Sequence, residues 1–201
     1  MATDLHLVMH GVAIKKHGTA AAVAEVIGKP ADIVESILAE AAEKDRVINA
    51  DGKYMLSPAG QMILAGEYSR FCGELCNNQA FVDAYERFEI INNELKQLIT
   101  DWQTMEVGGK RVANDHSDAD YDEKIIDRLG SLHEKFEPIL DQLVSGENRL
   151  GFYKNALNTA LEKAEDGEID WVSAANLASY HTVWFEMHED LLRLLGQERS
   201  E

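Results

Sequence analysis

No stretch of about 18 consecutive apolar residues occurs in the sequence, so no segment is predicted to cross a membrane as a helix. The first residues lack a basic segment followed by an uninterrupted apolar one, and a secretory signal is not expected. Cysteine is scarce, and the two cysteines, Cys72 and Cys76, lie four residues apart, which is no disulfide framework and fits a reducing compartment. These absences predict a cytoplasmic protein.

Basic residues are also few. The sequence holds 19 Lys and Arg against 36 Asp and Glu, a formal net charge of -17 at pH 7. Residues 1–70 carry seven basic and nine acidic side chains, so most of the acidic excess belongs to residues 71–201. A field of this sign repels phosphate backbones and anionic membrane surfaces. We therefore expect protein or small-molecule partners and no membrane partner.

The motifs of several well-known catalytic sites are missing. The sequence has no His-Glu-x-x-His, no Gly-x-Ser-x-Gly and no phosphate-binding glycine loop, and its helical part has no Glu-x-x-His of the kind that di-iron bundles use. We therefore predict that this chain alone is not an enzyme and assign it no catalytic residue, cofactor or metal. Whether it is a subunit of an enzyme complex stays open.

Residues 1–66 are predicted to form a small α+β domain. Apolar residues at helical spacing indicate three successive helices, the second capped by Thr19 and ended by Gly28. An Asp-Gly pair then joins two short strands, and Ser57 and Pro58 begin the next helix. The inner face of the third helix is expected to comprise Ile33, Ile37, Leu38 and Ala41.

This order of helix, helix–turn–helix and hairpin resembles the winged-helix domain of MarR-type regulators. The likeness covers about residues 5–66 and is carried by "GTAAAVAEVIGKPADIVESILAEAAEKDRVINADGKYMLSPAG", including the "LSPAG" turn after the wing. It implies DNA binding, with the third helix in the major groove. The residues that could then contact DNA, or a protein partner instead, are Ser36, Lys44, Arg46 and Lys53.

The third helix, however, carries the wrong charge for DNA. Its acidic residues are spread along its length, whereas Lys44 and Arg46 come at its far end. Readers of bases and anchors of phosphates are normally Arg, Lys, Asn, Gln or Ser. The charge pattern favours a winged helix that contacts protein, and the family resemblance favours DNA. The acidic positions are Asp32, Glu35, Glu40 and Glu43.

Residues 67–201 are predicted to form a bundle of four or five helices with no strand, so the fold class is mainly α. Residues 104–116 are expected to be a polar loop, Pro138 to kink or divide one helix, and residues 170–197 to form the last helix. One apolar seam comprises Phe81, Tyr85, Phe88, Asn92, Leu95, Ile99 and Trp102. Another comprises Ile125, Leu129, Leu132, Phe136, Ile139 and Leu143.

Polar and aromatic residues along the seams predict a small-molecule pocket in the bundle, because a buried polar group needs a partner. The alternative is that each of these side chains bonds to a neighbour and specifies packing. The predicted ligand-binding residues are Asn92, Trp102, His116, His133, His181, Trp184 and His188.

Two further patterns suggest metal sites. His6, His10 and His17 follow one side of the first helix, and His6 and His10 have the i, i+4 separation that could share a metal ion, although a solvated helix face is the simpler interpretation. "NDHSDADYDE", residues 114–123, has alternating aspartates but not the glycine and glutamate of a calcium loop. It is better interpreted as a helix start capped by Ser117. The two cysteines are expected to be packed thiols.

"TDWQ", "NDHSDADYD" and "SYHTVWFEMHEDLL" are similar to a module of proteins that accompany phosphoenolpyruvate-utilising, pyruvate phosphate dikinase-like enzymes, over much of residues 81–195. This likeness implies an accessory subunit. The favoured function is a non-enzymatic regulatory or accessory protein that binds a protein partner, with a metabolic enzyme as one candidate. The alternative is a MarR-like transcription regulator with an effector pocket in its helical half. A homodimer is compatible with both.

Overall fold

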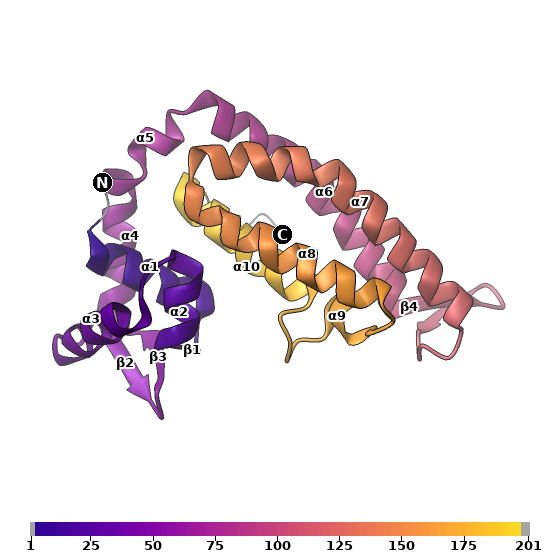
Figure 1. Ribbon diagram of the computed structural model, residues 1–201, viewed down its shortest axis with the longest axis horizontal. Coiled ribbons are helices and arrows are strands. Elements are labelled where there is room, and N and C mark those ends of the chain that lie inside the picture. The colour runs from indigo at the N-terminus through magenta and orange to yellow at the C-terminus, as the bar shows by residue number, and fades with distance from the viewer. Residues whose placement is uncertain (1–2, 198–201) are drawn as a thin grey trace. The chain divides into compact units, whose positions relative to one another are not determined.

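The computed structural model describes residues 3–197. Within this range the protein is mainly α-helical, as predicted, and its strands form two small antiparallel sheets. No helix in these residues is long and apolar enough to cross a membrane. The elements labelled in Figure 1 and their neighbours are α1 Asp4–Lys15, β1 Gly18–Thr19, α2 Ala20–Ile27, α3 Ala31–Glu43, β2 Val47–Ala50, β3 Lys53–Leu56, α4 Pro58–Phe71, α5 Gly73–Cys76, α6 Gln79–Gln103, β4 Thr104–Val107, β5 Lys110–Ala113, α7 Ala119–Gly146, a 3-10 turn Asn148–Leu150, α8 Gly151–Glu165, α9 Asp170–Ser173 and α10 Tyr180–Leu195.

The chain divides into two compact units. The first unit comprises, among the described residues, 3–79, 147–152 and 186–197, and the second comprises 80–146 and 153–185. The boundary expected at residue 66 falls inside α4, whereas the first unit continues to residue 79 and includes two later segments of the chain. Residues 147–152 and 186–197 therefore belong to the first unit although they lie far along the chain from residues 3–79.

The first unit follows the predicted order of helix, helix–turn–helix and hairpin. Its three strands pair antiparallel in the order β1-β3-β2. We call residues 47–56 the wing. Its turn is the expected Asp-Gly pair: Asp51 and Gly52 have φ of 52° and 78°, and the side-chain oxygen of Asn49 accepts a hydrogen bond from the Gly52 amide at 3.1 Å. This part of the sequence prediction is confirmed.

Three predicted helix ends of the first unit are confirmed by their hydrogen bonds. The hydroxyl of Thr19 accepts from the Ala22 amide at 3.2 Å, and α2 ends at Gly28 in the left-handed conformation. Ser57 accepts from the Gly60 amide at 2.9 Å, and Pro58 is the first residue of α4. The start of α4 lies so close to the end of α3 that a Cβ on Gly60 would meet the carbonyl oxygen of Arg46 at 1.9 Å.

The inner face of α3 differs from the prediction. Val34, Leu38 and Ala41 are fully buried, whereas Ile33 is 44% exposed and Ile37 is half-buried. Residues 34, 38 and 41 follow the i, i+4, i+7 pattern of one helical stripe, and the two isoleucines precede that stripe by one residue. The sequence alone does not decide between two adjacent apolar stripes, and the outer one remains exposed.

The second unit is built on α6 and α7, which run antiparallel. The side chain of Gln142 bonds to the carbonyl of Ala80 at 2.8 Å, and further along Lys135 pairs with Glu94 at 3.2 Å. The two predicted apolar seams are buried, which confirms them. Pro138 does not divide α7, which runs unbroken from residue 119 to 146. The predicted bundle is completed by α8 and the first part of α10, which supplies Tyr180 and Trp184 to its core.

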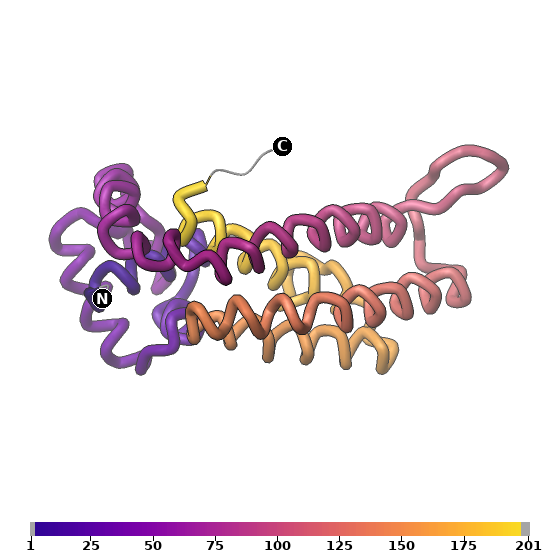
Figure 2. The backbone as a smooth tube through the Cα atoms, turned by 90° about the horizontal axis from the view of Figure 1, so that it is seen from above, coloured from indigo at the N-terminus to yellow at the C-terminus, as the bar shows by residue number. Residues whose placement is uncertain are grey.

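The expectation that residues 104–116 form a polar loop is wrong, because β4 and β5 form a hairpin there. Its turn residues Gly108 and Gly109 both have positive φ, as a two-residue hairpin turn requires. Figure 2 shows this hairpin extending beyond the ends of α6 and α7. Every one of its strand residues is at least partly exposed. No face of these strands is packed into a core, and the alternation of polar and apolar residues covers only the four positions of β4 and is absent from β5.

Two other boundaries differ from expectation. The last helix is interrupted: α9 ends at residue 173 and α10 begins only at Tyr180. The cap of α7 is Asp118, whose side chain accepts from the Tyr121 amide at 3.1 Å, and not Ser117. Asp118 immediately precedes the first helical residue and so takes the capping position, while the Ser117 hydroxyl donates to Asp115 at 2.6 Å.

Candidate functional sites

The outward side of α3 is acidic. Its four carboxylates, Asp32, Glu35, Glu40 and Glu43, are all exposed, and we call this surface, together with Ser36, the α3 face. The adjacent Lys44 ammonium donates to Glu40, and this bond lowers the pKa of the Glu40 carboxyl. The charge of the lysine is therefore partly neutralised within the helix.

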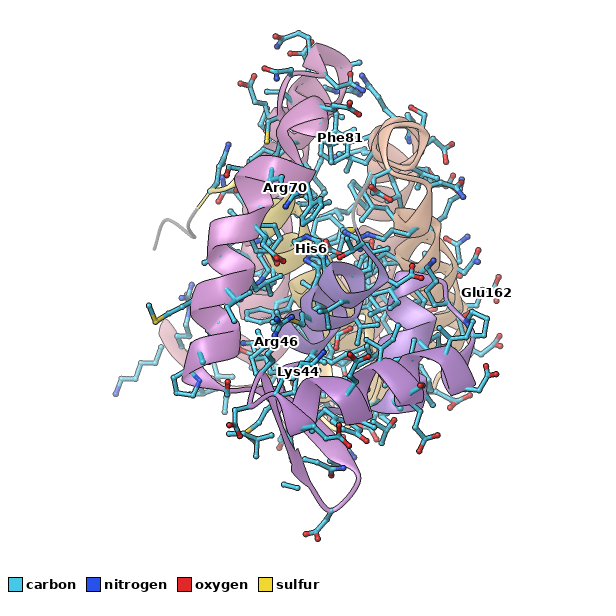
Figure 3. All side chains as sticks on the ribbon, turned by 90° about the vertical axis from the view of Figure 1, so that its left-hand side faces the viewer. His6, Lys44, Arg46, Arg70, Phe81 and Glu162 are labelled. Atoms are coloured by element: carbon cyan, nitrogen blue, oxygen red, sulfur yellow. The ribbon has the colours of Figure 1, made fainter. Side chains whose placement is uncertain are left out.

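The other cations expected to contact a partner lie beside the α3 face. Arg46 is half-buried, and its carbonyl accepts from the Ser57 amide at 3.0 Å, so its backbone joins the wing to α4. Lys53 is exposed on the wing just after the turn. Figure 3 shows Lys44 and Arg46 at the end of α3 that leads into the wing. The predicted contact residues thus form a short basic edge beside a longer acidic surface.

In the second unit, Asn92 and Trp184 are brought together. The Trp184 indole N–H donates to the Asn92 side-chain oxygen at 3.1 Å, and both residues are almost fully buried. The indole also stacks on Phe88 with ring centroids 5.1 Å apart and meets Phe136 at 4.5 Å. The polar groups of this cluster bond to each other, which is the packing alternative rather than an open ligand site.

The other histidines predicted to line the bundle pocket are divided between the two units. His133 lies 3.1 Å from the Tyr180 hydroxyl, and burial lowers its pKa, while Asn158 and nearby glutamates oppose this shift. His181 is half-buried, with a pKa lowered by burial. His188 belongs to the first unit, although it lies on the same helix. The three histidines therefore do not form one site within the second unit.

Trp102 and His116 do lie together, at the base of the β4–β5 hairpin. Their ring centroids are 4.5 Å apart, and the His116 Nδ1 lies 2.9 Å from a carboxylate oxygen of the buried Asp122. The Asn114 amide donates to the other Asp122 oxygen at 2.8 Å and to the Trp102 carbonyl at 3.0 Å. Tyr121 donates to two carbonyls of the same segment. This cluster anchors the hairpin to α7.

A surface depression of about 310 Å³ lies between α6 and α7. It is lined by Leu98, Leu132 and several charged side chains and contains none of the seven predicted ligand-binding residues. Two of its cations are engaged, since Arg128 pairs with Asp101 at 2.9 Å and Lys135 with Glu94. The depression therefore offers little to a charged ligand.

Sequence reasoning missed a buried charged cluster in the first unit, which we call the α1–α10 network. It consists of His10 on α1, Asp190 on α10 and Arg149 in the 3-10 turn. The Arg149 guanidinium donates two hydrogen bonds of 2.5 and 2.7 Å to the Asp190 carboxylate, and the His10 Nε2 lies 2.9 Å from the same carboxylate. The Asp190 carboxylate is fully buried and the Arg149 side chain is 8% exposed.

Electrostatics make this network strongly paired. Burial would raise the pKa of Asp190, but Arg149 and His10 beside it hold that pKa well below its usual range. Burial lowers the pKa of His10, with Asp190 opposing this shift and Arg149 adding to it. The His10 Nε2 also lies 3.0 Å from an Arg149 nitrogen. It can donate to Asp190 or accept from Arg149, but it cannot do both.

The expectation of a solvated histidine face on α1 is wrong for two of its three members. His6 and His10 are 3% and 1% exposed, and only His17 is exposed. His6 bonds to Glu67 at 3.1 Å, and the His10 Nδ1 lies 2.8 Å from the Tyr68 hydroxyl. In residues 3–197, no group of three or more His, Cys, Asp or Glu side chains is arranged to hold a metal ion.

The two cysteines differ. Cys72 is buried, and burial raises the pKa of its thiol to about 11, as expected of a packed thiol. Cys76 is exposed, contrary to that expectation, and its sulfur lies 3.4 Å from the Leu194 carbonyl. α4 ends at Phe71 and α5 begins at Gly73, so the two cysteines do not share one uninterrupted helix face.

Comparison of the chain with protein-family models, with curated proteins and with solved structures found no match.

Proposed function

We propose that this protein is a non-enzymatic regulatory or accessory protein that binds a protein partner through the α3 face. The observation that carries the proposal is the charge of that face: four exposed carboxylates occupy the helix that would enter a DNA groove. A carboxylate beside a phosphate backbone is repelled, whereas it attracts lysine and arginine side chains of a protein.

The side chains of the α3 face indicate what kind of partner surface would bind it. Ile33 on the same helix is 44% exposed, so the outward side of α3 combines negative charge with an apolar side chain. Interfaces commonly place an apolar contact inside a charged rim. The partner surface should therefore carry lysines or arginines around an apolar depression. The likeness of residues 81–195 to proteins that accompany phosphoenolpyruvate-utilising enzymes supports a metabolic enzyme as this partner.

The proposal is tested by affinity capture from native lysate with quantitative mass spectrometry. A variant with Asp32→Lys and Glu35→Lys reverses the charge of the α3 face. A matched control, Glu162→Lys with Asp166→Lys, makes the same change of net charge at exposed positions of the second unit. We expect one or more proteins to be retained by wild type and by the control and lost from the α3 variant.

Two results would contradict the proposal. Retention of the same proteins by the α3 variant would mean that the face does not contact them. Equal loss from both variants would mean that only the overall charge of the protein matters. Circular dichroism of both variants checks that they are folded, since all four positions are exposed and their substitution should leave the core intact.

A transcription regulator is the second candidate. It is favoured by the chain order α1-β1-α2-α3-β2-β3 and the sheet order β1-β3-β2, which a DNA-binding winged helix also has. Fluorescence anisotropy with labelled duplex from the upstream region of the gene, at about 50 mM salt, separates the two functions. Sequence-specific binding that is lost on replacing Lys44, Arg46 and Lys53 by Ala would establish this candidate.

A further inference from the structure

Helix α4 carries a second surface of the first unit, which does not depend on the α3 face. The structure describes all 14 residues of α4, and the buried ones among them are Gly60 and Leu64. Met62 is 78% exposed, the largest value for any large apolar side chain in residues 3–197. A helix that buries so little of its surface has a face without a packing partner.

The outward face of α4 is uncharged. Residues 54–66 contain no Asp, Glu, Lys, Arg or His, in a chain whose formal net charge is -17. The first charged residue of α4, Glu67, bonds to His6 at 3.1 Å on α1. Two copies of an acidic protein repel each other least where neither presents a carboxylate. Four exposed residues at i, i+4, i+7 and i+11, which we call the α4 stripe, are Pro58, Met62, Ala65 and Ser69.

A groove of about 490 Å³ adjoins the α4 stripe and is lined by Ala65 together with residues of α1, β3 and α10. Its apolar lining includes Val12, Ala13 and Leu56. Both cations that line it are engaged within the chain, since Arg193 pairs with Glu189 at 2.8 Å and Lys16 has an interaction of its own. The groove therefore suits an apolar side chain better than a charged group.

We propose that the α4 stripe is a self-association surface, on which a second copy of this protein packs antiparallel and Met62 of each copy enters the groove of the other. With a two-fold axis between positions 63 and 64, position 62 lies opposite position 65 of the second copy, and position 58 lies opposite position 69. The long Met62 side chain then meets the small Ala65, which lines the groove. One patch supplies both the protruding side chain and the depression that receives it, as a two-fold interface requires.

The size of the α4 surface predicts a weak dimer. A helix of 14 residues is about 21 Å long, and a strip of this length and about 20 Å in width covers about 400 Å² of each copy. Stable interfaces bury about 800 Å² per partner, so this contact belongs with the transient ones. We expect a dissociation constant of about 10–100 µM.

Sedimentation equilibrium of the full chain at about 5–500 µM tests the proposal, because this range brackets the expected dissociation constant. The dimer should be at least about threefold tighter at 0.5 M than at 0.05 M salt, because salt screens the repulsion between two acidic copies. Met62→Asp places a carboxylate in the apolar groove and should weaken the dimer at least about tenfold. The matched control is Ile90→Asp on α6, where the native side chain is 63% exposed, and it should dimerise like wild type.

Disulfide trapping tests the register of the two helices. All variants carry Cys76→Ser, because Cys76 is exposed whereas Cys72 is buried. A mixture of Met62→Cys and Ala65→Cys copies should form a covalent link between these two positions under mild oxidation. Ala59→Cys is the control, since Ala59 is exposed on α4 but lies outside the α4 stripe, and its link to Met62→Cys should be at least about tenfold less abundant.

Several outcomes would overturn the proposal. These are a monomer at every concentration, a dimer that Met62→Asp leaves unchanged, or an equal loss of dimer in Met62→Asp and Ile90→Asp. A dimer that weakens in high salt is held by ion pairs, and equal trapping through Ala59→Cys places the contact elsewhere; either result would also overturn it. Far-UV circular dichroism and melting temperature confirm that each variant is folded.

Discussion

Replacing Arg149 by Met should strongly destabilise the first unit. The substitution keeps most of the side-chain volume but removes both hydrogen bonds to the fully buried Asp190 carboxylate. Removing one partner of a buried ion pair leaves a buried charge that is poorly compensated, at a cost of about 3–5 kcal/mol. The neighbouring His10 is buried, and burial opposes the proton that it would need to replace the guanidinium, although the loss of Arg149 removes one of the causes that lower its pKa.

The double variant Arg149→Met/Asp190→Leu separates the pair energy from the cost of losing volume. Replacing both charged groups by apolar ones of similar size removes the uncompensated charge. We therefore expect the double variant to be less destabilised than the sum of the two single variants, with a coupling free energy of about 2 kcal/mol or more.

The assay must report the two units separately. All three tryptophans, Trp102, Trp171 and Trp184, belong to the second unit, so tryptophan fluorescence during urea unfolding follows that unit. Hydrogen exchange of peptides from α1 and the second half of α10 follows the first unit. A loss of less than about 1 kcal/mol in Arg149→Met, or a double variant that equals the sum of the single ones, would refute the argument.

Three other perturbations have defined outcomes. Gly60→Ala should lower the free energy of unfolding by about 2 kcal/mol or more in urea titrations, because its Cβ would clash with the Arg46 carbonyl; an unchanged midpoint would mean that α4 moves freely. Trp184→Phe should lower the free energy of unfolding by about 1–3 kcal/mol, because it leaves the buried Asn92 oxygen unpaired. Trp184→Phe/Asn92→Leu should recover part of this free energy, and a double variant whose loss equals the sum of the two single losses would argue against the bond. Stability should fall as the pH drops below 6.5 towards the lowered folded pKa of His10, because the unfolded imidazole takes up a proton that the folded one resists; His10→Gln should reduce this fall, and an unaltered pH profile would contradict it.

Local signals made the first unit predictable from sequence. The Thr19 and Ser57 caps, the left-handed Gly28 and the Asp-Gly turn of the wing act over a few residues, and each appears in the structure as predicted. The apolar seams of α6 and α7 were equally clear, because seven positions of the first and six of the second repeat at helical spacing.

Features that depend on distant residues were not predictable. The α1–α10 network joins His10 to groups 139 and 180 positions away, and nothing local marks them as partners. His10 and Asp190 lie next to apolar helix positions in the sequence, where solvent exposure is the simpler prediction, but the fold buries both. The β4–β5 hairpin is a different case: its Gly-Gly turn was a usable signal, but polar and apolar residues alternate over only the four positions of β4 and not in β5.

The residues predicted to line one bundle pocket lie in more than one cluster, for a geometric reason. Asn92 and Trp102 are ten residues apart on α6, which is about 15 Å along the helix. One therefore joins the aromatic cluster around Trp184 and the other joins His116 at the base of the hairpin. Residues that share a face of a long helix need not share a site.

The central claim is that the acidic α3 face contacts a protein. Zero-length carboxyl–amine cross-linking of the captured complex, with mass spectrometry of the linked peptides, tests it most directly. The claim predicts links from Asp32, Glu35, Glu40 or Glu43 to lysines of the partner, and their loss in the Asp32→Lys/Glu35→Lys variant. Links to the partner that come only from acids of the second unit, with none from α3, would contradict it.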